Sequence, residues 1–388
     1  MSLVNNQSAI VEIGSSKLVC IIGYLKNGKK VIAGSAVLPF DCAIEGMWKG
    51  KRFEAALRNV IETASAMAGI KIKKVSVGVP GAFCNVALSN ASINIESDDG
   101  LISERDVARL AEEAQLKIVP EGFEVLHCLP TVYRIDGQNT LNPIGNKGNV
   151  LFGSMSVIFA EKAFLNSIAT SFMKAGIGIE HFIASPLGIG LMAIPPHERD
   201  DVAILVDTGH YTTDVTVFKG DGIFYHSVVQ LGGYDITVAL SKRLDIDLDL
   251  AEQLKKRYVY GLASNDDTSY DIVRLKNGRI KKFPHDDVRV IIENLNVDIL
   301  AYVKEKLDEA EINLHSKMRI YFCGGAMSLN AGSMAFIKDS IGRDVKFIRQ
   351  HQPGMASIDT STAEGILDYS MKMDDNRNNG FLKKLLGK

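Results

Sequence analysis

The sequence lacks the features that would place a protein outside the cytosol or across a membrane. It has no apolar run near the roughly 18 to 20 residues that a membrane-spanning helix needs. Its N-terminus has no basic region followed by an apolar stretch, so we expect no secretory signal. The five cysteines are scattered, with no C-x-x-C pair and no histidine cluster nearby. This scatter argues for a reducing cytosol and against both a zinc site and a disulfide framework.

Net charge is also small. Lys and Arg number 44 and Asp and Glu number 46, which gives a formal charge of −2. No global electrostatic argument therefore points to nucleic acid or to an acidic substrate, and we expect no nucleic-acid partner. The hydrophobic content of 46% and charged content of 23% are those of an ordinary globular protein. At 388 residues the chain is long enough for two domains, each with a substantial core.

Residues 204–218 predict a β-hairpin whose turn could bind a ligand. Apolar residues lead to Asp207, the chain turns at Gly209, and alternating apolar residues resume at Val215. Small residues in such a turn let backbone N–H groups converge on a phosphate, and a carboxylate at its base can hold Mg²⁺ through water. Taken alone, the segment fits an ordinary hairpin with a polar turn equally well.

A second stretch, residues 10–22, repeats this pattern near the N-terminus. Glu12 precedes Gly14 by the same interval that separates Asp207 from Gly209, and both pairs lie between apolar strands. Two hairpins of this kind predict a duplicated domain with a nucleotide held between the two halves.

Strands and helices alternate in the rest of the chain, around one block of different texture. That block, residues 82–161, has alternating segments around a helix that Ser103 and Asp106 are spaced to cap, which indicates a separate α+β insertion. Elsewhere we expect strands over 8–40 with a turn at Asn27-Gly28. The other expected elements are helices over 53–67, 163–174, 181–194, 236–244, 251–257, 286–310 and 360–371, strands over 75–79 and 318–322, a surface turn over 195–201 and a hairpin at 276–279.

Three further places in the second half suit a nucleotide. A glycine pair before a helix points amides and a positive dipole end at an anion. An acid and a lysine three residues apart share one helix face, although a solvated salt bridge is the commoner arrangement. A turn without bulky side chains lets a flat ring or a phosphate approach the backbone. The residues concerned are Gly232 and Gly233, Glu252 and Lys255, and Gly324, Gly325 and Ala326.

The last residues predict a tether. Residues 374–380 have the composition of a flexible linker, and residues 381–388 would form a short amphipathic basic helix. Such a segment suits an anionic membrane surface, weakly as one copy and well as several linked copies; a frayed or self-docked terminus is the alternative. The predicted membrane-binding residues are Phe381, Leu382, Lys383, Lys384, Leu385 and Leu386.

In their order, these motifs resemble the FtsA family of bacterial actin-like cell-division proteins over essentially the whole chain. The resemblance implies an α/β, actin-like duplicated ATPase fold, with two lobes built on mixed five-stranded sheets. The hairpins match the family's phosphate-1 and phosphate-2 motifs, and residues 324–326 match its adenosine motif. The implied domains are 1–81 plus 162–198 for the core of lobe I, 82–161 for the inserted 1C subdomain, 199–257 plus 318–371 for the core of lobe II, 258–317 for subdomain 2B, 372–380 for the linker and 381–388 for a membrane-targeting helix.

The resemblance also implies ATP and Mg²⁺ as ligands. It carries Glu12 and Asp207 over as metal ligands through water, and it assigns ribose and adenine contacts to Glu252 and Lys255. It assigns no catalytic residue. The implied nucleotide-binding residues are Gly14, Ser15, Ser16, Lys17, Gly209, His210, Tyr211, Thr212, Thr213, Gly232, Gly233, Glu252, Lys255, Gly324, Gly325, Ala326 and Met327.

The function implied is that of an adaptor that polymerises into filaments, binds the C-terminal peptide of the tubulin-like FtsZ and other divisome proteins, and ties the FtsZ ring to the inner face of the cytoplasmic membrane at the division site. A PilM-like pilus-assembly adaptor shares this fold and insertion but would not usually need its own amphipathic anchor. A sugar or acetate-type kinase would need a catalytic carboxylate and polar substrate ligands, and residues 82–161 show no such pattern.

Three positions depart from the family pattern. Glu12 stands where the family has Asp, and its extra methylene would crowd the metal. His210 and Tyr211 stand where the family has small residues, so their side chains must point away from the phosphates. Ser185 precedes Pro186 where an acid often orients the attacking water. Because orientation acts mainly on the transition state, we expect nucleotide binding with weak or absent hydrolysis.

Overall fold

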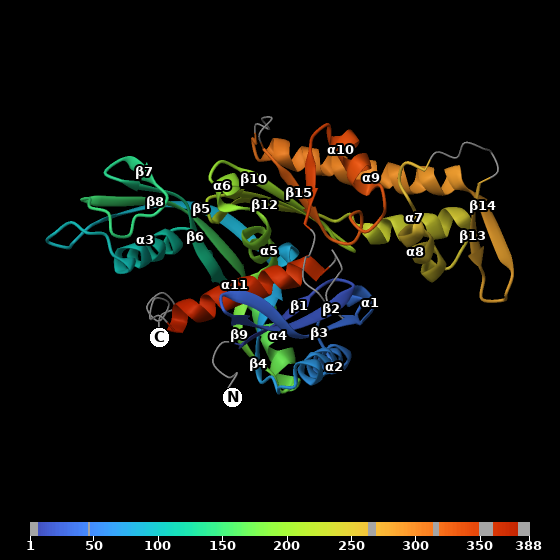
Figure 1. The fold of residues 1–388 in the computed structure, drawn as a ribbon, viewed down its shortest axis with the longest axis horizontal. Coiled ribbons are helices and arrows are strands. Elements are labelled where there is room, and N and C mark those ends of the chain that lie inside the picture. Colours follow the sequence, from blue (N-terminus) through green and yellow to red (C-terminus); the bar gives the residue numbers. More distant parts are fainter. Residues whose placement is uncertain (1–6, 46, 263–268, 313–317, 349–359, 379–388) are drawn as a thin grey trace. The chain divides into compact units, whose positions relative to one another are not determined.

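The computed structural model describes residues 7–45, 47–262, 269–312, 318–348 and 360–378 (Figure 1). Contacts between Cα atoms divide the chain into two compact units. Unit 1 comprises Met1–Ala203, Thr216–His226 and Thr362–Lys388, and unit 2 comprises Ile204–Val215 and Ser227–Ser361. No helix of the described residues is both long and apolar enough to cross a bilayer.

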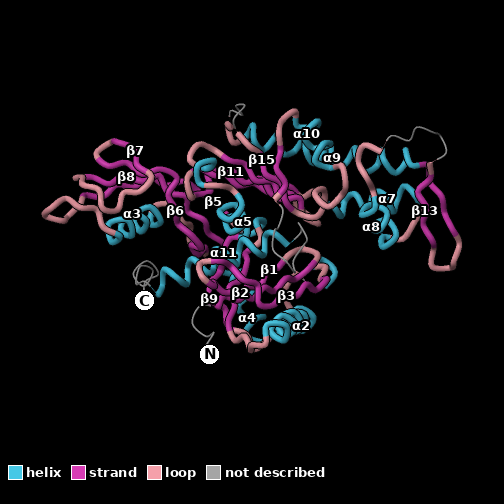
Figure 2. The backbone as a smooth tube through the Cα atoms, in the orientation of Figure 1, coloured by secondary structure: helices cyan, strands magenta, loops and turns pink. Residues whose placement is uncertain are grey.

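The first five-stranded sheet has the strand order β3-β2-β1-β4-β9 (Figure 2). Its first three strands form antiparallel hairpins, and β1–β4 and β4–β9 are parallel pairs. Asn27 and Gly28 both have positive φ, 52° and 72°, as a tight two-residue hairpin requires. The strands are β1 (Gln7–Ile13), β2 (Lys17–Lys26), β3 (Lys29–Pro39), β4 (Lys74–Val79) and β9 (Gly178–Ala184).

Helices cover both faces of this sheet, so its central strands are almost continuously buried (Figure 1). On one face lies α2 (Lys51–Ala68), and its five buried residues are those of the predicted apolar stripe: Phe53, Leu57, Val60, Ile61 and Ala64. On the other face lies α11 (Ser361–Asn378), which approaches so closely that a Cβ on Gly78 would lie 2.3 Å from the side chain of Ile366. Outside the insertion, the other described helices of unit 1 are α1 (Cys42–Glu45), α4 (Lys162–Lys174), α5 (Ser185–Ala193) and α6 (Pro196–Arg199).

The second five-stranded sheet repeats the topology of the first, with the order β12-β11-β10-β15-β16. In both sheets the chain makes two hairpins, adds a fourth strand beside the first and then a fifth beside the fourth, and β10–β15 and β15–β16 are parallel. The duplication predicted from the two hairpin motifs is therefore confirmed. The strands are β10 (Ala203–Thr208), β11 (Thr213–Lys219), β12 (Gly222–Val229), β15 (Ile320–Cys323) and β16 (Val345–Phe347).

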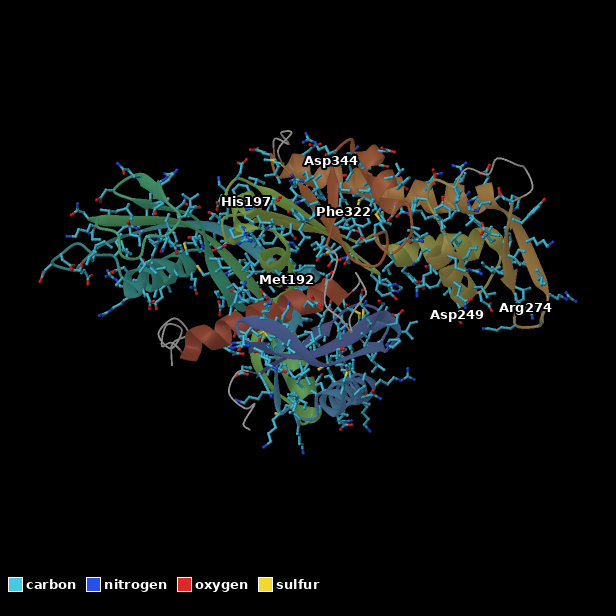
Figure 3. All side chains as sticks on the ribbon, in the orientation of Figure 1. Met192, His197, Asp249, Arg274, Phe322 and Asp344 are labelled. Carbon is cyan, nitrogen blue, oxygen red and sulfur yellow. The ribbon has the colours of Figure 1, made fainter. Side chains whose placement is uncertain are left out.

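Unit 2 carries its helices and one additional hairpin around the second sheet. The fully buried Phe322 of β15 lies in its core (Figure 3). The hairpin predicted at 276–279 is present, with Gly278 at φ 80° in its turn. The remaining elements are α7 (Gly233–Leu244), α8 (Leu248–Arg257), α9 (His285–Glu309), α10 (Ser333–Ile341), β13 (Tyr270–Arg274) and β14 (Ile280–Pro284).

Inside the insertion, a four-stranded sheet of order β5-β8-β6-β7 packs against α3 (Glu104–Leu116). The predicted helix start is confirmed: Ser103 N–H donates to the Asp106 carboxylate at 2.9 Å, and Asp106 N–H donates back to the Ser103 hydroxyl. A 3-10 turn, η1 (Gly81–Phe83), leads into the block. Its strands are β5 (Asn85–Asn94), β6 (Phe123–Ile135), β7 (Gln138–Thr140) and β8 (Val150–Glu161).

Three expectations differ from the structure. The helix predicted over 181–194 is a strand as far as Ala184 and a helix only from Ser185, because a short apolar run does not distinguish the two by periodicity. The surface turn predicted over 195–201 contains the buried Arg199, whose guanidinium donates to Asp221 Oδ1 at 2.7 Å. Helix α11 continues to Asn378 and so includes most of the predicted linker, residues 372–380.

Candidate functional site

The turns that follow β1 and β10 have the same local structure. In residues 14–17, the first loop, Gly14 N–H donates to Lys17 O at 3.0 Å. In residues 209–212, the second loop, Gly209 N–H donates to Thr212 O at 2.8 Å. A Cβ on either glycine would lie 2.9 or 3.0 Å from that same carbonyl oxygen, so a side chain would disturb the turn. The sequence echo between the two hairpins therefore reflects a shared geometry.

The N-terminus of α7 braces the second loop. Gly233 N–H donates to Gly209 O at 3.0 Å, and Tyr234 N–H donates to His210 O at 2.8 Å. Gly232 N–H donates to the Asp235 carboxylate at 2.8 Å. These amides are thus bonded within the protein, and the expectation that the glycine pair aims them at an anion is wrong. The pair is needed instead for close approach, because a Cβ on Gly232 would lie 2.6 Å from His210 O.

The bulky residues of the second loop pack with a third ring. His210 and Tyr211 have their ring centroids 4.5 Å apart, and each lies near Tyr234 at the start of α7, at 5.2 and 5.0 Å. Tyr234 was not among the predicted site residues. It gives the two rings a packing partner within unit 2, which small residues in this loop would not need.

Two carboxylates lie near each other on the hairpin that carries the second loop. Burial, and then the charge of Asp207, raise the pKa of Asp214 to about 8, against a smaller lowering effect of a hydrogen bond from the Thr212 hydroxyl. Asp214 is therefore mostly protonated near neutral pH. Among the described residues no three or more His, Cys, Asp or Glu side chains cluster as a metal site.

Glu252 and Lys255 form a buried network, not the solvated salt bridge that was the alternative. Lys255 is 6% exposed, and its ammonium donates to Glu252 Oε2 at 2.6 Å, to Gly233 O at 2.7 Å and to Thr237 Oγ1 at 2.9 Å. Burial alone would raise the pKa of Glu252, but the Lys255 charge and the hydrogen bonds hold it at about 2. Burial lowers the pKa of Lys255, and the Glu252 charge opposes that shift. The hydrogen bonds to Gly233 O and Thr237 Oγ1 therefore fasten α8 to the start of α7, and the third proton bonds to Glu252 on α8 itself.

The glycine-rich turn after β15 meets the same elements. Gly324 has φ +83°, and a Cβ there would lie 2.3 Å from both Asp207 Oδ1 and Thr208 O. Ala326 N–H donates to Thr208 O at 2.9 Å. On the other side of this turn, a Cβ on Gly233 would lie 3.1 Å from the Ala326 Cβ. Unit 2 therefore brings its predicted residues from β10, the second loop, α7, α8 and the 324–327 turn into one place.

Other predicted residues lie apart from this group or outside the description. Glu12 on β1 is opposite Val19 on β2 and beside Gly78 on β4, in unit 1 with the first loop. Ser185 begins α5 and is buried. The predicted membrane-binding residues of segment 381–388 lie outside the described residues.

Sequence reasoning missed two side chains that hold predicted site elements in place, one in each unit. Asn330 Nδ2 donates to the carbonyls of Lys255 and Tyr258, both at 2.8 Å, and so ends α8 against the glycine-rich turn. Trp48 Nε1 donates to Gly14 O at 3.1 Å in the first loop. Neither residue lies within a motif, so only the tertiary structure identifies them.

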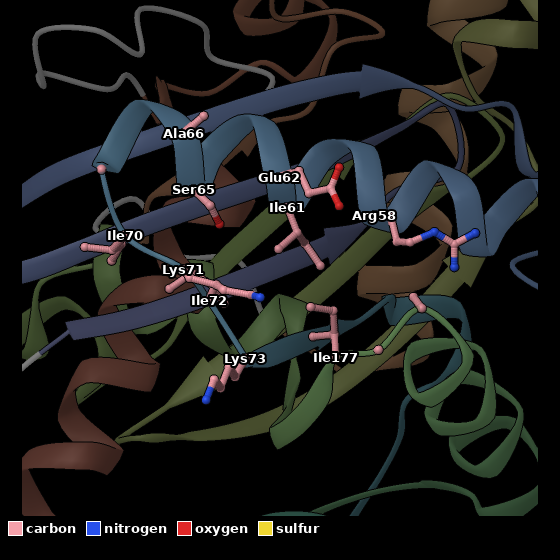
Figure 4. A pocket seen from close by; sticks show the side chains of 13 residues that line it. Arg58, Ile61, Glu62, Ser65, Ala66, Ile70, Lys71, Ile72, Lys73 and Ile177 are labelled. Atoms are coloured by element: carbon pink, nitrogen blue, oxygen red, sulfur yellow. The ribbon is translucent and has the colours of Figure 1, made fainter.

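Unit 1 also has a groove of about 480 Å³ between the end of α2, residues 69–73 and residues 175–177 (Figure 4). Its lining combines apolar and charged side chains, including Ile61, Ile177, Glu62 and Lys71 (Figure 4). None of the residues predicted to bind nucleotide lines it.

The repeated sheets with helices on their faces define an actin-like, two-lobed α/β protein. Solved structures share this fold over nearly the whole chain. A PilM–PilN type IV pilus biogenesis complex has a TM-score of 0.65 at 17% identity, covering 95% of this chain and 99% of that one. MreB5 of Spiroplasma citri bound to ADP has a TM-score of 0.58 at 13% identity, covering 96% and 99%. Identities this low establish the fold alone, for PilM as for MreB.

Sequence comparison identifies the family. A family model described as "SHS2 domain inserted in FTSA" matches residues 81–159, and one described as "Cell division protein FtsA" matches residues 204–371. The curated cell division protein FtsA of Bacillus subtilis is 24% identical over 377 residues, which cover 95% of this chain and 84% of that protein. FtsA of Streptococcus pneumoniae is 25% identical, covering 89% and 76%. The chain belongs to the FtsA family of cell division proteins, as its motifs predicted.

Proposed function

We propose that this protein is an ATP-binding adaptor that polymerises and tethers the FtsZ ring to the inner face of the cytoplasmic membrane during division. The similarity to cell division proteins of the FtsA family supports the part of the proposal that places the protein in cell division. The observation that carries the nucleotide part is the meeting, in unit 2, of the second loop, the Glu252–Lys255 network and the 324–327 turn. The likeness to MreB5 of Spiroplasma citri, solved with ADP and with AMPPNP, agrees with this proposal.

Each part of the proposed nucleotide site has a distinct task. Backbone groups of the first and second loops contact the phosphates, and the turn over 324–327 contacts adenosine. Glu252 faces the ribose, while Lys255 acts through the position of α7, because its protons are bonded within the protein. Asp207 of unit 2 and Glu12 of unit 1 are the residues that would hold Mg²⁺ through water. Bound Mg²⁺ would offset the charge of the phosphates.

Calorimetric titration with ATP and Mg²⁺ tests this site, and a turnover assay on the same sample tests the expected weakness of hydrolysis. We expect binding without brisk turnover, because Ser185 offers no carboxylate to orient an attacking water. Failure to bind ATP would remove the nucleotide from the proposal. Turnover of several ATP molecules per second would contradict the expected weak hydrolysis.

The proposed partners are the FtsZ C-terminal peptide, further copies of this chain in a filament, other divisome proteins and an anionic membrane surface. Membrane contact is assigned to residues 381–388, which follow α11 in the sequence. Each buried large apolar side chain of that segment is worth about 1.5 to 3 kcal/mol before ordering costs, and each surface lysine about 1 kcal/mol.

Removing residues 381–388 is expected to reduce sedimentation with anionic liposomes by roughly tenfold or more, because the apolar face and its flanking lysines go together. Two variants of the full chain refine the test. Leu385→Ser should lose most of the binding, since it removes apolar area from the face, and the matched control Lys388→Ser should lose little, since two other lysines remain. A truncated protein that sediments like the full chain would contradict the tether.

A further inference from the structure

Trp48 is the single tryptophan of the chain, and its place in the fold is unusual. It lies just before α2 and is 5% exposed. Both Met47 and Trp48 have positive φ, 52° and 57°, a region that bulky residues rarely adopt. Backbone strain of this kind persists where surrounding contacts enforce it, and it gathers at functional sites. The contacts of the indole show which surrounding groups hold the backbone in this conformation.

Its N–H holds one of three consecutive carbonyls of the first loop. Trp48 Nε1 donates to Gly14 O at 3.1 Å, and the N–H groups of Cys42 and Phe40 donate to the oxygens of Ser15 and Ser16, both at 2.9 Å. In a planar trans peptide the C=O and the following N–H point in opposite directions. Anchoring these carbonyls to segment 40–48 therefore directs the next N–H groups, those of residues 15–17, away from that segment. Successive N–H groups directed this way form an anion-binding concavity.

The ring of the indole also packs against the base of the inserted domain. Its ring meets Phe83 at 5.3 Å and Phe164 at 6.3 Å, both edge-on. Those two phenylalanines stack on each other at 3.9 Å with an interplanar angle of 9°. Phe83 lies at the entry to the matched domain, residues 81–159, and Phe164 lies just beyond its exit. The indole thus connects the first loop to both ends of the insertion within unit 1.

We propose that Trp48 is a positioning residue for nucleotide binding: its N–H fixes the Gly14 peptide so that the first loop presents its amides to a phosphate, and its ring ties that loop to the base of the inserted domain. The inference rests on the proposed nucleotide binding. It adds that the affinity for ATP depends on an indole proton, and that a change at the Phe83–Phe164 stack alters this affinity.

Because the chain has one tryptophan, biosynthetic replacement changes this site alone. Benzothienylalanine keeps the size and shape of the ring but has sulfur in place of the N–H. Calorimetry with ATP and Mg²⁺ should then give an affinity roughly fivefold lower, the effect of one lost hydrogen bond. The control is 5-fluorotryptophan, which keeps the N–H and should bind ATP normally. Its ¹⁹F resonance should shift when ATP saturates the protein, which a purely structural indole would not produce.

A second variant tests the link to the insertion. Phe83→Leu keeps an apolar side chain but removes the ring on which Trp48 rests, so it should weaken ATP binding and move the ¹⁹F resonance of the free protein. The possible outcomes distinguish a failure of the proposed function from a failure of the role proposed for Trp48. If the natural protein binds no ATP, the proposed function fails first. If it binds ATP and the benzothienyl protein binds equally well, or if the ¹⁹F resonance stays fixed at saturation, the role of Trp48 is overturned.

Discussion

Lys255→Met should lower the free energy of unfolding by about 3 kcal/mol, the range expected when one partner of a buried ion pair is removed. The substitution leaves the Glu252 carboxylate, Gly233 O and Thr237 Oγ1 without the donor that joins them. Because that donor fastens α8 to the start of α7, ATP binding should fall as well. Chemical denaturation measures the first effect, and calorimetry measures the second.

The neighbouring lysine provides a matched control. Lys256 lies 3.3 Å from the other oxygen of the same carboxylate, but its side chain is 64% exposed. Exposed pairs contribute about 0 to 1 kcal/mol, so Lys256→Met should change stability little. The double variant Glu252→Gln with Lys255→Met should recover part of the loss, because it also removes the carboxylate charge that has lost its buried partner. Equal effects of the two lysine substitutions would show that the network at Lys255 does not stabilise this site.

Gly324→Ala should abolish ATP binding and destabilise unit 2. An added Cβ would lie 2.3 Å from Asp207 Oδ1 and from Thr208 O, so backbone must move at the turn that the proposal assigns to adenosine. Its φ of +83° adds a further penalty of about 1 kcal/mol for a residue other than glycine. Calorimetry with ATP and thermal unfolding measure the two effects.

Gly278 offers a control that separates steric collision from backbone strain. It has nearly the same φ, +80°, but a Cβ there would meet nothing within 4 Å. Gly278→Ala should therefore cost only the penalty of about 1 kcal/mol for its backbone conformation and leave ATP binding unchanged. If the two alanine variants bind ATP alike, the close approach of the 324–327 turn to Asp207 has no part in binding.

Much of the fold could be predicted because its signals are local. The turn at Asn27-Gly28, the Ser103–Asp106 cap and the apolar spacing of α2 each depend on residues a few positions apart. The boundary at Ala184 could not be predicted in this way. Residues 181–184 become a strand because β4 pairs with them, and that partner lies about a hundred residues earlier in the chain.

The candidate site likewise has some features that could be predicted from local sequence and others that could not. The two glycine loops repeat in the sequence, so their shared turn geometry could be expected. The directions of the Gly233 and Tyr234 amides and the burial of Lys255 could not, because each depends on a carbonyl from another element. A solvated pair and a buried network have the same spacing on a helix, and only burial distinguishes them.

By itself, the sequence determined the duplicated α/β plan, the inserted domain and the family, because periodicity, turn residues and motif order are written along the chain. The tertiary structure decided what the polar groups of the site do. It turned the Gly233 and Tyr234 amides toward the second loop, gave every ammonium proton of Lys255 a partner and set Trp48 against Gly14. The physical reason is that a hydrogen bond is fixed by the distance between its two groups in space, and the spacing of residues along the chain does not contain that distance.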